Sequence, residues 1–153
     1  MEQKAVYIGA DHAGFKLKKE MKKYLKKEGY AVVDKGNTKL DPKDDYPDYG
    51  YKTAKAVSQS KGKAMGILFC GSAQGICIVA NKVKGIRAVA VVNERDAKAT
   101  REHNDANVLC LSGWNMPRKK AEKIIKAWLT AEFTGEERHV RRIKKIEKIE
   151  KHG

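Results

Sequence analysis

Short apolar runs alternate along this chain with longer segments in which apolar residues recur every three or four positions. Each run is followed by a glycine, an acid or another small or polar residue. The five runs cover residues 5–8, 30–33, 64–69, 87–92 and 108–111. Runs of four to eight mostly apolar residues bounded by turn signals are typical of buried strands. We therefore expect five strands.

The longer segments between these runs have the spacing of amphipathic helices. They cover residues 13–28, 49–60, 75–83, 94–103, 118–133 and 136–151, and residues 34–48, rich in Asp, Lys, Gly and Pro, are expected to form a loop. Strands that alternate with helices predict a parallel sheet covered on both faces. We expect an α/β, Rossmann-like three-layer sandwich with a five-stranded parallel sheet, formed by one domain over residues 1–153.

The last predicted helix carries an apolar stripe at steps of three residues: Val140, Ile143, Ile146 and Ile149. A stripe of this length exceeds what a small domain needs for its own packing. We therefore expect the C-terminal helix to pack across a subunit interface.

Charge is the most unusual feature of the composition. The 153 residues include 33 Lys and Arg against 19 Asp and Glu, which gives a formal net charge of +14. Such an excess can indicate nucleic-acid binding, but here the lysines of residues 16–27 alternate with Leu17, Met21 and Leu25, as on a solvated helix face. No known nucleic-acid-binding motif is present. We expect no specific nucleic-acid partner.

The apolar runs indicate where the protein resides, and the cysteines indicate whether disulfides or metals stabilise it. The longest uncharged apolar stretch, residues 64–80, is interrupted by glycines and polar residues, and the N-terminus lacks a signal-peptide pattern. We expect a cytoplasmic protein without a membrane span. The three cysteines, Cys70, Cys77 and Cys110, fit neither a disulfide framework nor a zinc pattern. We expect no metal and no cofactor.

Candidate chemistry follows two of the strands, because ligands of such sheets lie beyond the carboxyl ends of the strands. The third strand leads into Cys70-Gly-Ser-Ala-Gln-Gly-Ile, where small residues and a helix start predict an anion site that lowers the pKa of Cys70. The first leads into Asp11-His12. Either Asp11 caps the following helix, with His12 as a solvent-exposed neighbour, or both side chains lie at the ligand-binding edge of the sheet.

Two further segments carry candidate binding residues. His103 and Asn104 end the fourth predicted helix. A histidine at a helix C-terminus is often only a cation that interacts favourably with the helix dipole. Arg138 and Arg142 lie four residues apart, on one face of the last helix, and suit a phosphate. The alternative for these arginines is ordinary surface charge.

Six motifs stand in order along nearly the whole chain. They are GADHAGFK (9–16), DYPDY (45–49), CGSAQGI (70–76), ANKVKGIRA (80–88), HNDANVL (103–109) and RHxxR (138–142). Together they resemble the type B ribose-5-phosphate isomerase family, which also contains the galactose-6-phosphate isomerase subunits. The resemblance implies a metal-independent aldose–ketose isomerase that works as a homodimer or homotetramer with active sites between subunits.

The resemblance also implies roles for the residues that match the motifs. Cys70 would be the base that moves a proton between C1 and C2 of the open sugar, and His103 would open the sugar ring. The Ser72 hydroxyl and the loop N–H groups would stabilise the enediolate. The residues that supply these N–H groups are Gly71, Ser72, Ala73, Gln74 and Gly75.

The remaining roles implied by the resemblance concern substrate binding. Asp11, His12 and Asn104 would bind sugar oxygens, and Arg138 and Arg142 the phosphate. Ribose 5-phosphate and ribulose 5-phosphate are the expected substrates.

Two alternatives stay open beside this reading. Trp114 stands where many members of the family have a phosphate-binding Arg. A six-carbon phosphosugar, such as allose or galactose 6-phosphate, is therefore one alternative substrate. The other alternative is a non-catalytic sugar-phosphate or nucleotide binding module that uses the same anion loop.

Overall fold

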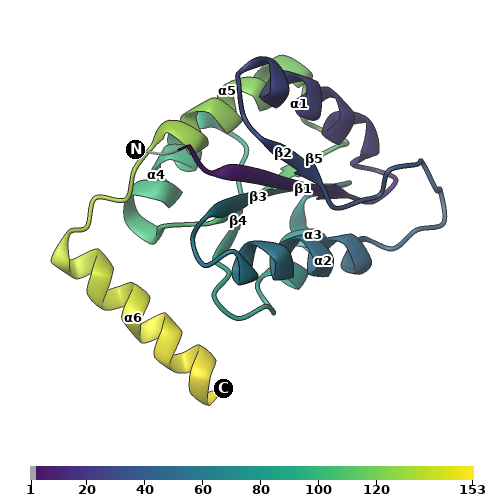
Figure 1. Cartoon of the computed structure of the whole chain (residues 1–153). Helices are drawn as coiled ribbons and strands as arrows, with labels where there is room; N and C mark the ends of the chain where they lie inside the picture. The colour runs from purple at the N-terminus through teal and green to yellow at the C-terminus, as the bar shows by residue number, and fades with distance from the viewer. Residues whose placement is uncertain (1–2) are drawn as a thin grey trace.

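Five parallel strands form one sheet in the computed structural model of the chain, which describes residues 3–153 (Figure 1). Their order across the sheet is β2-β1-β3-β5-β4. The strands are β1 (Ala5–Ala10), β2 (Val32–Asp34), β3 (Ala64–Cys70), β4 (Ala88–Ala90) and β5 (Val108–Ser112). Ala10 pairs with Phe69, and Cys70 with Ser112, so the three central strands end at one edge.

Helices cover both faces of the sheet, which confirms the predicted α/β fold. The helices are α1 (Phe15–Lys27), α2 (Tyr46–Gln59), α3 (Gln74–Ala80), α4 (Glu94–Asn104), α5 (Arg118–Thr130) and α6 (Glu137–His152). Figure 1 shows α1, α4 and α5 on one side of the sheet and α2 and α3 on the other. Every residue of β3 is buried, because a central strand of such a sheet is covered on both faces.

Three helix boundaries differ from the prediction by three residues, among them the end of α3, which is Ala80 rather than Val83. α2 begins at Tyr46 rather than Tyr49, because Pro47 lies in its first turn, where a fixed φ and a missing N–H are both tolerated. The expected loop therefore ends three residues early. α5 ends at Thr130 rather than Phe133, because Ala131 has an extended backbone with ψ of 146°.

The C-terminal helix α6 extends away from the other helices, after an extended linker (Figure 1). Ile143 is buried, whereas Ile146 and Ile149 are 50% and 71% exposed. The Gly85 N–H donates to both Glu150 carboxylate oxygens, at 3.0 and 3.1 Å. Packing of this helix across a subunit interface stays a prediction. Within the described part of the chain, no helix is long and apolar enough to cross a membrane.

Candidate active site

A pocket of about 340 Å³ opens where the central strands end. It is lined by Asp11, His12, Ala13, Tyr46, Cys70, Gly71, Ser72, Gly75 and Trp114. The loops that follow β3 and β5 are tied together at this edge: the Gly113 N–H donates to the Cys70 carbonyl at 2.8 Å, and the Ser112 hydroxyl to the Gly71 carbonyl at 2.6 Å. The pocket therefore rests on rigid strand ends.

Cys70 is the last residue of β3, and the following loop curls around its sulfur. The thiol is buried, and burial raises the pKa of Cys70 above its ordinary value. Backbone N–H groups of Ile76, Ala73 and Ser72 point at the sulfur and oppose that rise. The expectation of a lowered pKa is therefore wrong for this chain, because the loss of hydration outweighs the N–H groups.

Aromatic rings rest on two glycines of this loop. A Cβ on Gly71 would lie 2.4 Å from the Trp114 ring, and one on Gly75 would lie 2.6 Å from the Tyr46 ring. Neither position can therefore carry a side chain without moving a ring. Between them, Ala73 has a positive φ of 71°, which turns the chain from the loop into α3.

Asp11 and His12 leave β1 at the same edge as Cys70. Asp11 is 5% exposed and accepts the Gly14 N–H at 3.0 Å, just before α1 begins, so it stabilises this turn while also lining the pocket. Burial raises the pKa of Asp11. Asp11 therefore makes the expected helix-start contact, while its role towards a ligand stays a prediction.

His12 is held by an acid that the sequence did not single out. Asp44 accepts hydrogen bonds from the His12 backbone N–H and from the ring at Nδ1, both at 2.8 Å. One potential metal-ligand atom each of Asp11, His12 and Asp44 lies within 4.8 Å of the other two, so the three could bind one metal ion. The hydrogen bonds between His12 and Asp44 account for the closeness of these two residues.

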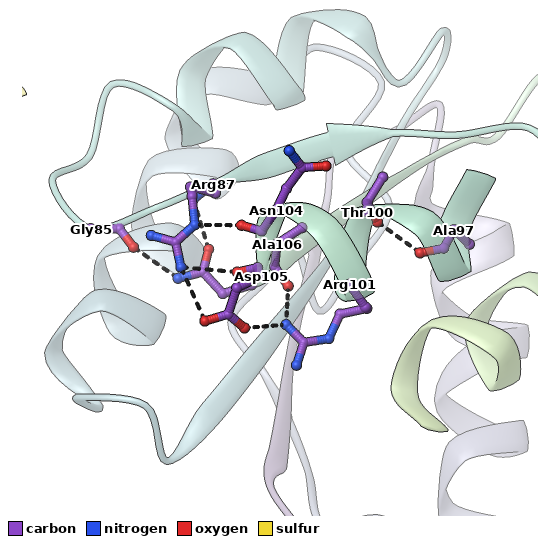
Figure 2. A network of polar contacts seen from close by, with 9 residues as sticks. Gly85, Arg87, Ala97, Thr100, Arg101, Asn104, Asp105 and Ala106 are labelled. Carbon is purple, nitrogen blue, oxygen red and sulfur yellow. Dashed lines mark hydrogen bonds and ion pairs between the residues drawn. The ribbon is translucent and has the colours of Figure 1, made fainter. Parts of the chain in front are cut away.

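His103 and Asn104 lie at the opposite edge of the sheet, where β5 begins. Figure 2 shows how Arg87 and Arg101 hold this end of α4. Arg87 Nε donates to the Asn104 carbonyl at 2.8 Å, and Arg101 Nη1 donates to Asp105 Oδ1 at 2.9 Å. Asp105, with φ of 47°, ends the helix. Both His103 and Asn104 are exposed beside this fixed turn.

α6 brings His139 to His103. The His103 and His139 rings stack with centroids 4.7 Å apart and an angle of 19° between their planes. Burial and the nearby charge of His103 lower the pKa of His139. Arg138 is exposed and its Nε lies 3.0 Å from Glu136 Oε2, and Arg142 is exposed one turn later.

The predicted site residues thus form two groups. The first group shares the pocket or its loop: Asp11, His12, Cys70, Gly71, Ser72, Ala73, Gln74 and Gly75. The second group surrounds the end of α4: His103, Asn104, Arg138 and Arg142. The four residue steps from Val108 to Ser112 separate the two edges by roughly 13 Å along β5. One chain does not bring the two groups together.

Sequence reasoning missed three residues of these groups. Tyr46 and His139 belong to the quoted motifs but had no assigned role, and Asp44 precedes one of those motifs. A signal existed for His139, because it lies four residues before Ile143 on the same apolar helix face. None distinguished Asp44 from the other acids of its loop.

Comparisons with known proteins show which family and which proteins this chain resembles. The family model described as Ribose/Galactose Isomerase matches residues 6–146. The chain is 44% identical over 146 residues to the probable ribose-5-phosphate isomerase B of Mycoplasma genitalium, covering 95% of each. It is 41% identical over 147 residues to ribose-5-phosphate isomerase B of Escherichia coli, covering 96% of this chain and 97% of that protein.

A solved structure shares the whole architecture. The crystal structure of ribose-5-phosphate isomerase B from Mycoplasma genitalium with bound ribulose-5-phosphate matches this chain with a TM-score of 0.95. The sequence identity is 42%, and the match covers 100% of both chains.

Proposed function

The chain belongs to the ribose/galactose isomerase family, and from this membership we propose that it interconverts ribose 5-phosphate and ribulose 5-phosphate through a cis-enediolate. The observation that carries the proposal is the Cys70 thiol, which faces the pocket within a ring of backbone N–H groups. Aldose–ketose isomerisation needs a base beside a site that stabilises a developing oxyanion.

In this proposal Cys70 acts as thiolate and removes the proton from C2 of the open-chain aldose. The electron pair moves through C1 to the carbonyl oxygen, and the enediolate forms. The O2 proton passes to O1, and Cys70 returns its proton to C1 as the C2 carbonyl forms, which gives the ketose. Loop N–H groups and the Ser72 hydroxyl stabilise the enediolate, each donor contributing about 3 kcal/mol.

The second group of residues completes the site from a neighbouring subunit. We propose a homodimer in which His103 of one chain opens the sugar ring, Asn104 binds sugar oxygens, and Arg138 and Arg142 bind the phosphate beside Cys70 of the other chain. The roughly 13 Å between the two edges along β5 supports this arrangement. Exposed Ile146 and Ile149 on α6 supply an apolar surface for association.

The proposed location of the enzyme is the cytoplasm. Cys70, Cys77 and Cys110 are all free thiols. Free thiols, without disulfides, fit a reducing compartment.

The direct test is turnover of ribose 5-phosphate by the purified protein, with formation of the ketose as the readout. Cys70→Ala should abolish turnover, because the base is lost. Cys77→Ala is the matched control: Cys77 lies in α3, outside the pocket lining, and this variant should keep wild-type activity. Absence of turnover in the wild type, or full turnover in Cys70→Ala, would contradict the proposal.

One observation favours testing a six-carbon substrate beside the five-carbon one. The wall of the pocket carries Trp114, which is 72% exposed and has no charge to offer a phosphate. Allose 6-phosphate and galactose 6-phosphate therefore belong in the substrate panel. Solvent-deuterium incorporation at C2 distinguishes all these isomerases from a binding module, which would bind the sugar without exchanging its proton.

A further inference from the structure

Asp44 reaches the candidate site from the loop between β2 and α2. Its side chain is 3% exposed, although its neighbours in the sequence are exposed. Its Oδ1 accepts two hydrogen bonds from His12, one from the backbone N–H and one from ring Nδ1, both at 2.8 Å. Its Oδ2 accepts from Asn37 Nδ2 at 3.1 Å. Both oxygens of Asp44 therefore have partners.

These contacts determine which nitrogen of His12 carries a proton. Burial alone would raise the pKa of Asp44, but the hydrogen bonds from His12 and Asn37 lower it below its ordinary value. An ionised carboxylate only accepts hydrogen bonds, so Nδ1 of His12 must be the donor. The neutral ring then has its lone pair on Nε2.

Asp44 is itself held in place, through Asn37, by the end of β1 and the first turn of α1. The Asn37 N–H donates to the Ala10 carbonyl at 3.1 Å, at the end of β1. Lys18 of α1 donates to the Asn37 carbonyl and, at 2.8 Å, to Asp34 Oδ1. Lys18 is 2% exposed, so this anchor is part of the protein interior. The loop is therefore fixed before a ligand arrives.

We propose that Asp44 is a positioning residue of the isomerase: it holds the His12 ring beside the Cys70 pocket in the Nδ1–H form and leaves Nε2 for a sugar hydroxyl. This proposal rests on the proposed function, in which His12 binds a sugar oxygen. Nε2 can accept a hydrogen bond from a sugar hydroxyl only while the ring proton is on Nδ1. Without Asp44, the ring can rotate, and its proton can move to Nε2.

The resting protein allows a test that does not need turnover. Nitrogen-15 labelling of the four histidines, with His12→Asn to assign the His12 signals, reports the protonation state of each ring nitrogen by NMR. We expect the wild type to show His12 protonated at Nδ1 when neutral. Asp44→Ala should shift this population towards the Nε2-protonated form. Unchanged His12 signals in Asp44→Ala would overturn the proposal.

A matched control is available in the same loop. Asp41 is exposed, and its Oδ1 accepts the Lys43 N–H at 3.0 Å, a contact that an asparagine keeps. Asp41→Asn removes the same charge as Asp44→Asn, close by in the sequence. We expect the control to leave both the His12 signals and the kinetics unchanged. Equal effects of the two variants would reduce the role of Asp44 to general loop charge and would overturn the proposal.

Kinetics test the consequence for the reaction. Asp44→Ala should lower kcat/KM by roughly 10- to 100-fold, the effect of a lost hydrogen bond to a charged group. Asp44→Asn keeps an acceptor for His12 and should lose less activity than Asp44→Ala, which also guards against a folding defect. Full activity in Asp44→Ala, with an active wild type, overturns the positioning role alone. An inactive wild type with the expected His12 signals instead contradicts the proposed function.

Discussion

Separation of Cys70 from His103 leads to a quantitative prediction for mixed subunits. Cys70 pairs with Ser112 at one end of β5, and His103 lies in the last turn of α4, just before β5 begins at the other end. The roughly 13 Å between these ends exceeds the hydrogen-bond distance at which both groups must meet one sugar. We therefore expect each site to take Cys70 from one subunit and His103 from its partner.

The size of the effect follows from two-fold symmetry. A mixed dimer of Cys70→Ala and His103→Ala chains has one site with both substitutions and one site with neither. Purified through a different tag on each chain, the mixed dimer should have about half of the wild-type activity. Random association of equal amounts gives half mixed dimers, and therefore about a quarter of the wild-type activity.

The assay is ketose formation from ribose 5-phosphate, with each variant measured alone and after joint refolding. Each parent dimer lacks one of the two groups at both sites and gives the baseline. A refolded mixture with no more activity than the average of its parents would refute the reasoning. Cys70 and His103 of a single chain would then serve the same site, and the two edges would have to approach each other.

Further predictions concern stability and specificity. Lys18→Met should lower the free energy of unfolding by about 3 kcal/mol in urea titrations, because it leaves Asp34 without its buried partner, whereas Lys19→Met, at an exposed position, should change little. Burial alone would raise the pKa of Asp34, but hydrogen bonds led by that from Lys18 lower it. The stability from this carboxylate is therefore complete above the unfolded value of about 4 and is lost as the pH falls through the lower folded value, and Asp34→Asn should flatten this decline. Thr53→Val should raise the melting temperature by about 2–4 °C, because the buried Thr53 hydroxyl has no partner in residues 3–153. Trp114→Arg should lower the KM for ribose 5-phosphate in steady-state assays by placing a cation at the pocket wall, and an unchanged KM would contradict a role of this position in phosphate binding.

The sequence was most informative where burial is complete. A central parallel strand such as β3 is covered on both faces, so every residue is apolar or small and the run is visible without any alignment. The start of α2 was harder to predict, because Pro47 fits both a loop and the first turn of a helix. Local patterns therefore identified the elements better than their ends.

Site residues were predictable where a motif supplied them and unpredictable where a tertiary contact did. The Cys70 loop is visible as small residues after a strand, but the burial that raises the pKa of Cys70 depends on neighbouring elements. Asp44 is one of several acids in a polar loop, and only the fold brings it to His12. This contact cannot be read from the sequence, because Asp44 and His12 are 32 residues apart.

The two outermost strands of the sheet, β2 and β4, are each only three residues long. An outermost strand has unpaired N–H and carbonyl groups that a strand of another chain can pair with, and a short outermost strand has few of them. Strand addition, the route by which many sheets polymerise, therefore has little template here. We therefore expect subunits to associate through the helical surfaces, where side-chain shape and charge can restrict association to a defined partner.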